Sequence, residues 1–202
     1  TDRVWGFVQD HHLPGLFVVN RMDKEHANFD RVIEGLHEHF GHSVHPMHLP
    51  IGTGETFRGV VDLFDMKAYE FEKDGKGAVK SIEIPADLKA RAEALRRELM
   101  ESAAETDEKL MEKYLETETL TEEEFRTGLA EGVRGGQIFP ILCASPVHNM
   151  GAALILDAIV KYLPGADTGH HYTTEGKEIP SDVKGAPAAY VFKNISDPHI
   201  GD

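Results

Sequence analysis

The spacing of hydrophobic residues along the first 41 positions alternates between helical and extended patterns. Apolar residues recur every three or four positions over 1–10 and again over 29–40, which predicts a helix in each segment. Between them, the unbroken apolar run 16–19 predicts a short buried strand. Asn28 is a preferred residue before the first turn of a helix, and Gly41 is a preferred residue after the last. The order helix–strand–loop–helix is typical of a doubly wound α/β sheet.

After residue 43 the pattern changes to short apolar runs and then to long helical periodicity. The short runs are separated by glycine-containing turns and predict strands over 44–51, 58–62, 67–71 and 78–84. Helical spacing follows over 85–116, with an expected break at Thr106-Asp107. Thr121 and Glu124 form a capping box that opens a further helix, which Gly135-Gly136 ends.

Sheet-like periodicity returns with a buried strand over 137–142, a loop, and a helix over 150–163. Gly, Pro, Thr and charged residues dominate 164–187 and predict a linker, after which 188–195 begins a new β element. We therefore predict an α/β fold, the C-terminal part of a doubly wound sheet with an inserted α+β subdomain, followed by the first strand of another domain. The predicted parts are sheet 1–43, insert 44–136, sheet 137–164, linker 165–187 and next domain 188–202.

Composition places the chain among soluble globular proteins. Its 202 residues are 41% hydrophobic and 28% charged, and no apolar run approaches the ~20 residues that cross a membrane. Cys143 is the single cysteine, which rules out an internal disulfide and fits a reducing cytoplasm. The net charge of −14, with no local basic patch, argues against direct binding of nucleic acid. Because the chain begins with Thr1 rather than Met, we expect it to be part of a longer protein.

The loop Asn20-Arg21-Met22-Asp23 follows the first predicted strand directly and suits the reading of a guanine base. The Asp23 carboxylate can accept two hydrogens, from the guanine ring N1–H and its exocyclic amine, and adenine offers no such pair. The Asn20 amide would brace the loop and reach the other edge of the base, and the Arg21 stem would cover one ring face. Taken alone, the four residues also fit an ordinary Asx turn after a strand.

A second loop, Cys143-Ala144-Ser145, also follows a buried strand. In an open parallel sheet, ligand-binding loops gather at the carboxyl ends of the strands, so two such loops on neighbouring strands can hold a base from two sides. Taken alone, this tripeptide also fits an ordinary strand-to-helix turn.

Together with residues along nearly the whole chain, the two loops resemble the translational GTPase elongation factor G and its paralogues. The residues that carry the resemblance are Asn20-Arg21-Met22-Asp23 with Ala27-Asn28-Phe29, Pro50-Ile51-Gly52 with Phe57-Arg58-Gly59-Val60-Val61-Asp62-Leu63, Ile84-Pro85-Ala86, Leu110-Met111-Glu112-Lys113-Tyr114-Leu115, Pro140-Ile141-Leu142-Cys143-Ala144-Ser145 with Asn149 and Gly151, Leu156-Asp157-Ala158-Ile159 with Tyr162-Leu163-Pro164, and Phe192-Lys193 with Asp197-Pro198 and Gly201.

The resemblance implies part of a P-loop GTPase, from the late GTP-binding domain through its insert to the start of the β-barrel of domain II. It implies GTP or GDP as the ligand, with base-binding positions at Asn20, Arg21, Asp23, Ser145 and Pro146. It also implies action on the ribosome in the cytoplasm, in translocation or, for a paralogue, in recycling, with the insert facing ribosomal stalk proteins.

The sequence contains no Gly-x4-Gly-Lys-[Ser/Thr] phosphate loop, and no Asp-x-x-Gly precedes the loop Asn20–Asp23. We therefore predict no catalytic residue and no Mg²⁺ ligand in this chain, and we expect the chain alone not to hydrolyse GTP. The alternative is a protein-interaction module whose acidic insert docks ribosomal stalk protein, with no nucleotide binding by this chain. Residues 81–131 hold 15 acidic and 7 basic residues, which fits either a solvated helix face or a docking surface for stalk protein.

Two residues depart from the family pattern, in which a Lys stands at Arg21 and an Ala at Pro146. Arg can still cover the base, so the first change is mild. Proline has no N–H to donate to guanine O6, an acceptor that adenine lacks, and loss of that donor costs about 1–3 kcal/mol. We expect weaker or less selective guanine binding, unless Val147 supplies the donor from a shifted loop.

The histidines and the cysteine are expected to be structural residues. The closely spaced histidines are His37, His39, His42, His45 and His48. Their spacing does not place them on one helix face and no nearby Cys completes a zinc pattern, so we predict surface histidines and no metal site. Cys143 is expected to be a small buried residue.

Overall fold

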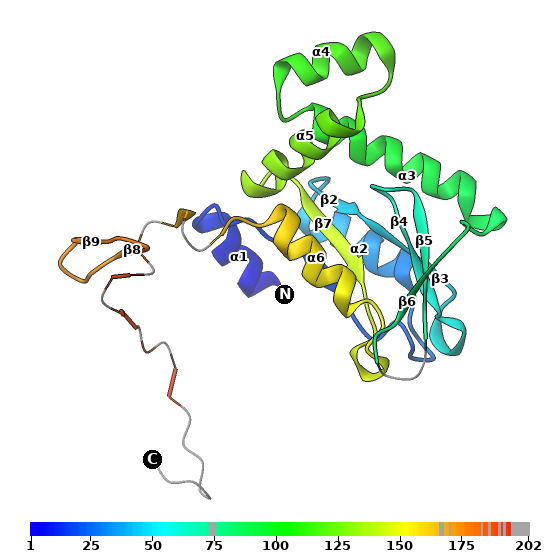
Figure 1. The fold of residues 1–202 in the computed structure, drawn as a ribbon, viewed down its shortest axis with the longest axis horizontal. Helices are drawn as coiled ribbons and strands as arrows, with labels where there is room; N and C mark the ends of the chain where they lie inside the picture. The colour runs from blue at the N-terminus through cyan, green and yellow to red at the C-terminus, as the bar shows by residue number, and fades with distance from the viewer. Residues whose placement is uncertain are drawn as a thin grey trace, which may run out of the picture. The chain divides into compact units, whose positions relative to one another are not determined.

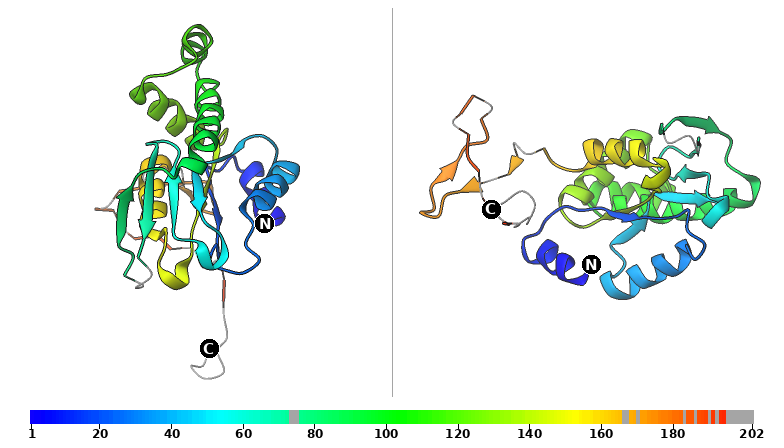
Figure 2. Two further views of the ribbon diagram at one scale, coloured as in Figure 1. Left: turned by 90° about the vertical axis from the view of Figure 1, so that its right-hand side faces the viewer. Right: turned by 90° about the horizontal axis from the view of Figure 1, so that it is seen from below.

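Three short parallel strands form the central sheet in the order β1 (Phe17–Val19), β7 (Phe139–Cys143) and β2 (Val44–Pro46). This computed structural model describes residues 1–72, 76–165, 168–169, 171–182, 184–185, 187–189, 191 and 193–194. Helices α1 (Asp2–Asp10) and α2 (Phe29–Phe40) cover one face of the sheet, and α6 (Ala152–Tyr162) covers the other (Figures 1 and 2). All five residues of β7 are buried, as expected of a central strand covered on both faces.

A second sheet is an antiparallel meander of β3 (His48–Ile51), β4 (Gly59–Asp62), β5 (Lys67–Phe71) and β6 (Val79–Ile82). A short 3₁₀ helix, η1 (Gly54–Thr56), lies between β3 and β4. The single strand predicted over 44–51 is wrong, because β2 and β3 belong to different sheets.

Met47 is the residue at which the chain changes sheets. Its N–H donates to the carbonyl of Ile141 in β7, and its carbonyl accepts from Leu63 beside β4, both at 2.9 Å. Residues 44–46 therefore lie in the parallel sheet, although the sequence pattern placed them in the insert. A continuous apolar run shows that a segment is extended, but it does not show which strands it will pair with.

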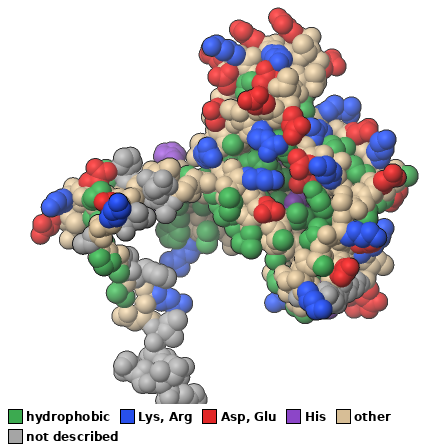
Figure 3. All heavy atoms as spheres, in the orientation of Figure 1, with side chains coloured by type: hydrophobic (Ala, Val, Ile, Leu, Met, Phe, Trp, Pro, Cys, Tyr) green, Lys and Arg blue, Asp and Glu red, His purple; other side chains and the backbone are tan. Residues whose placement is uncertain are grey.

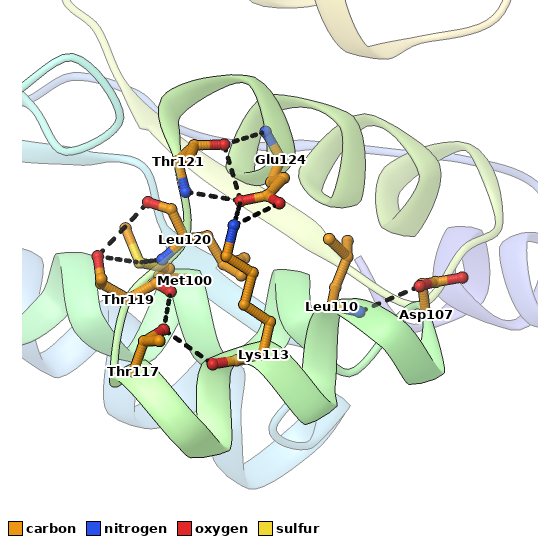
Figure 4. A network of polar contacts seen from close by, with 9 residues as sticks. All are labelled: Met100, Asp107, Leu110, Lys113, Thr117, Thr119, Leu120, Thr121 and Glu124. Atoms are coloured by element: carbon orange, nitrogen blue, oxygen red, sulfur yellow. Dashed lines mark hydrogen bonds and ion pairs between the residues drawn. The ribbon is translucent and has the colours of Figure 1, made fainter.

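Three helices complete the insert: α3 (Ala86–Ala104), α4 (Glu108–Thr117) and α5 (Glu122–Arg134). The predicted break at Thr106-Asp107 is confirmed, since the Asp107 side chain caps α4 by accepting from the N–H groups of Lys109 and Leu110. The capping box of Thr121 and Glu124 is also confirmed (Figure 4). The ammonium of Lys113 lies 2.6 Å from Glu124 Oε1 and joins α4 to the start of α5.

Glycine allows α5 to approach α3 closely. A Cβ on Gly128 would lie 2.5 Å from the carbonyl oxygen of Ala103, far inside van der Waals contact. Most of the buried side chains of these helices belong to one hydrophobic cluster, which includes Leu99, Phe125 and Leu129. A second cluster contains residues of both sheets, so the inserted part and the parallel sheet share a core.

The predicted α/β fold with an inserted α+β part is confirmed in residues 1–164. Residues from 165 onward form a separate unit, in which β8 (His171–Tyr172) pairs with β9 (Glu178–Ile179) inside the segment predicted as a linker. The strand expected over 188–195 and the following domain lie largely outside the described residues. No helix of the described part has the length and apolar character that spanning a bilayer requires.

Candidate functional site

The two loops predicted to read a base lie next to each other, at the carboxyl ends of adjacent strands. β1 and β7 pair in parallel, with Val19 opposite Cys143. The Ala144 N–H donates to the Val19 carbonyl at 3.0 Å, and the Met22 N–H returns to the Ala144 carbonyl at 3.2 Å. The sheet therefore extends by two hydrogen bonds into the loops and fixes one loop against the other.

Asp23 and Ser145 meet where the two loops join. Ser145 is fully buried, and its hydroxyl donates to Asp23 Oδ1 at 2.7 Å. The Lys24 ammonium lies 3.3 Å from the other carboxylate oxygen, and the Asp23 side chain is 10% exposed. The hydrogen bond from Ser145, together with Lys24, lowers the pKa of the Asp23 carboxyl against the opposing effect of burial. Asp23 is therefore a fixed, ionised hydrogen-bond acceptor.

Asn20 and Arg21 give the first loop its shape. The Asn20 Oδ1 accepts from the Arg21 N–H at 2.6 Å, a hydrogen bond between adjacent residues at the start of the loop. Arg21 has φ +61°, a left-handed conformation that costs an L-residue about 1 kcal/mol or more. Both side chains are exposed.

The second loop forms a short 3₁₀ helix, η2 (Pro146–His148), closed by Asn149 with φ +51°. Most of its backbone N–H groups are already bonded. Within residues 144–150, all of them described, the donor–acceptor pairs are Ala144 to Val19, Ser145 to Met150, His148 to Ser145, Asn149 to Pro146 and Met150 to Ser145. Pro146 has no N–H to donate. Of the N–H groups in this loop, only that of Val147 has no hydrogen-bond partner within the described chain.

This arrangement suits a planar ligand that offers adjacent donors. Asp23 presents two oxygens, one held by Ser145 and one paired with Lys24, and a base with two neighbouring N–H donors would take the place of the Lys24 ammonium. The structure thus brings Asp23 and Ser145 into contact and places Asn20, Arg21 and Pro146 in the same two loops. The pairing of Lys24 with Asp23 was missed by sequence reasoning, although the two residues are adjacent.

The prediction of surface histidines is wrong for His48, which is buried, and holds only in part for His37 and His45, which are half-buried. His48 is 2% exposed, and its Nδ1 accepts from the Cys143 N–H at 3.4 Å between the two sheets. It begins β3, directly after the change of sheets at Met47, a position that the sequence pattern did not reveal. Cys143 is buried as predicted, and burial raises the pKa of its thiol. Within the described residues, no three His, Cys, Asp or Glu side chains are arranged to hold a metal ion.

Two comparisons with known proteins agree with this geometry. The family described as the elongation factor Tu GTP binding domain matches residues 1–165. The crystal structure of a protein from Thermus thermophilus is similar to 84% of this chain, with a TM-score of 0.75 and 32% sequence identity. The matched part is 26% of that protein, so the chain spans about a quarter of its length.

The family match covers both strand-end loops, the insert and the closing helix α6. With the α/β architecture and the paired loops, it accounts for residues 1–164 as one part of a nucleotide-binding domain. The chain therefore belongs to the family of elongation factor Tu GTP-binding domains, the guanine-nucleotide-binding domains of translational GTPases.

Proposed function

We propose that this chain is the guanine-base-recognition portion of an elongation factor G-like translational GTPase that acts on the ribosome in the cytoplasm. Its role there is translocation or, if the protein is a paralogue, recycling. Asn20, Arg21, Asp23 and Ser145 form the base site in this proposal, with Pro146 at the position that faces guanine O6. The resemblance along the insert supports the elongation factor G type.

The observation that carries the proposal is the contact between Ser145 and Asp23. The Ser145 hydroxyl donates to one oxygen of the Asp23 carboxylate and lowers its pKa, so the carboxylate is ionised. The same hydrogen bond orients the carboxylate to accept the guanine N1–H and exocyclic amine. Preorganised acceptors cost little ordering free energy when the ligand binds. A structural ion pair alone would not need Asp23 at the end of a strand beside a second strand-end loop.

Substitution of Asp23 tests the base assignment directly. Asp23→Asn replaces one acceptor oxygen by an NH₂ donor, which repels the exocyclic amine of guanine and matches the C2 carbonyl of xanthine. In the whole protein, GDP affinity should fall at least about tenfold and xanthosine diphosphate affinity should rise, because a buried acceptor is exchanged for a donor. Glu25→Gln removes a neighbouring exposed charge and serves as the control. Equal GDP affinities in all three proteins would reject the assignment.

The chain supplies base contacts, and we assign it no contacts to the phosphates or to Mg²⁺. Hydrolysis of GTP requires a phosphate cradle, the metal ion and a positioned water. The 202-residue chain should therefore release no phosphate from GTP under conditions in which the whole protein turns over. Phosphate release by the chain alone, abolished by Asp23→Asn, would contradict this part of the proposal.

A second candidate function is docking of ribosomal stalk protein by the inserted helices. Leu115 on α4 is 70% exposed, and a shallow hollow beside it is lined by Met111 and by Glu105, Glu108 and Glu112. On the face that Figure 3 shows, acidic and basic side chains are interspersed over these helices, so the acidic residues do not form one uniform patch on that face. Leu115→Ser should weaken capture of purified stalk protein and leave GDP affinity unchanged, whereas unchanged capture would reject this candidate.

A further inference from the structure

The loop of the insert that contains Thr53 and Gly54 is hydrogen-bonded directly to the loop that contains Asp23, the first of the two loops proposed to bind the base. The Gly54 N–H, at the start of η1, donates to the Met22 carbonyl at 2.9 Å. The neighbouring Thr53 hydroxyl donates to the Ala27 carbonyl at 2.7 Å. These bonds lie on either side of Asp23 and join segments that are about 30 residues apart in sequence. The loop that presents Asp23 is thus held at both ends by the insert.

Met22 is hydrogen-bonded both to this loop of the insert and to the loop after β7, the second loop proposed to bind the base. Its N–H donates to Ala144, its carbonyl accepts from Gly54, and its side chain is 1% exposed. The Met22 side chain belongs to the hydrophobic cluster that also contains Ile51 and Phe57, which lie on either side of the Thr53–Gly54 loop. The residue next to Asp23 is therefore fixed through its backbone and its side chain, and the insert contributes to both.

The insert also reaches the second reading loop. Gly77, near the turn between β5 and β6, has φ +76°, and a Cβ at this position would lie 2.6 Å from Asn149 Nδ2. Figures 1 and 2 show this hairpin beside the loop between β7 and α6. Each reading loop thus has its own contact with the insert.

We infer that Thr53 and Gly54 are positioning residues of the base site, which hold the Asn20–Ala27 loop in its guanine-reading conformation through hydrogen bonds to Ala27 and Met22. This inference rests on the proposed function, because it assigns the insert a role at that same site. Arg21 is held in a left-handed conformation that an unsupported loop would leave. A loop that is free to leave its binding conformation loses affinity in proportion to the time it spends elsewhere.

Thr53 offers a matched pair of variants. Thr53→Val keeps the shape of the side chain and removes the hydroxyl, whereas Thr53→Ser keeps the hydroxyl. In the whole protein, Thr53→Val should raise the Kd for GDP about fivefold, the size of one lost hydrogen bond, and Thr53→Ser should stay within about twofold of wild type. Inosine diphosphate lacks the exocyclic amine that Asp23 accepts, so its Kd should rise less and the preference for GDP should fall.

Gly54 gives an independent test from the backbone. A Cβ on Gly54 would lie 3.2 Å from the Lys24 carbonyl and press on the reading loop, at φ +57°. Gly136→Ala serves as the control, since Gly136 has φ +66° and its Cβ would make only ordinary contacts. Both variants carry left-handed strain and should lower the melting temperature, but Gly54→Ala alone should weaken GDP binding.

The outcomes separate this inference from the proposed function. A wild-type protein that binds no guanine nucleotide overturns the proposed function, and the inference with it. GDP binding that is equal in Thr53→Val and Thr53→Ser overturns the inference alone. Equal losses of affinity for GDP and inosine diphosphate in Thr53→Val also overturn the inference alone, because they would show that Thr53 has only a structural role. Selective loss of GDP affinity that Thr53→Ser restores supports positioning.

Discussion

Ser145 donates a 2.7 Å hydrogen bond to Asp23 across 122 residues of sequence. The two residues approach because β1 and β7 are parallel neighbours whose carboxyl ends lie at the same edge of the sheet. The insert, which separates them in sequence, packs against both reading loops. The proposed base site is therefore built from three segments, and the polar side chains assigned to base binding lie in the two strand-end loops.

Removal of the Ser145 hydroxyl should weaken base recognition. Ser145→Ala leaves the Asp23 Oδ1 without its donor, which costs about 1–3 kcal/mol. We expect the Kd for GDP to rise roughly tenfold in the whole protein, as titration with fluorescent GDP would show. Ser81→Ala makes the same chemical change on exposed strand β6 and should have no effect. If both variants bind like wild type, Ser145 does not orient Asp23 for the ligand.

Pro146 should limit guanine selectivity. Pro146→Ala introduces an N–H where the family pattern has a donor to guanine O6, which should strengthen GDP binding by about 1–3 kcal/mol and increase the preference for GDP over ADP. Calorimetric titration of the whole protein with both nucleotides measures this. The unpaired Val147 amide is the competing donor. Unchanged affinities for GDP and ADP would reject a role of Pro146 in limiting guanine selectivity.

Local patterns in the sequence predicted most elements of the fold. The Asn28 cap, the break before Asp107 and the capping box at Thr121 each depend on residues within one helical turn, and each is found as predicted. The change of sheets at Met47 was not predictable in this way. It depends on partners in β7 and beside β4, which are distant in sequence.

The candidate site was predictable in its chemistry and less so in its support. The residue types at Asn20–Asp23 and Ser145 indicated polar side chains at the ends of two strands, and the structure joins Asp23 to Ser145. The contacts from Thr53 and Gly54 were not foreseen, because a threonine and a glycine in a turn carry no sign of a distant partner. Their role depends on tertiary packing alone.

Two glycines in helices should respond oppositely to alanine. In Gly128→Ala the new Cβ would lie 2.5 Å from the Ala103 carbonyl, so α5 must move away from α3 at a cost of about 1–3 kcal/mol or more. A Cβ added at Gly35 in α2 would meet open space, and Gly35→Ala should stabilise the protein by roughly 0.5–1 kcal/mol. Urea unfolding of the 202-residue chain compares the two. Equal effects in the two variants would contradict the close approach of α5 and α3.

His48 should make the stability of the chain fall in mild acid. Burial lowers its pKa to about 3, and acceptance at Nδ1 from the Cys143 N–H requires the neutral ring. The unfolded chain binds a proton at this residue below its ordinary pKa of 6.5, and the folded chain does not until about pH 3. Stability contributed by the neutral ring is therefore complete above pH 6.5 and falls as the pH drops towards 3.

His48→Asn tests this, because the Asn Oδ1 can accept the same N–H and does not titrate. Between pH 7 and pH 5, the free energy of unfolding of wild type should fall by about 2 kcal/mol more than that of the variant, at ~1.4 kcal/mol per pH unit for one proton. Urea unfolding of the 202-residue chain at the two pH values measures the difference. His45, whose pKa burial lowers to about 4, should add a similar slope in both proteins. Parallel loss of stability in wild type and variant would show that the His48 ring accepts its proton without leaving the core.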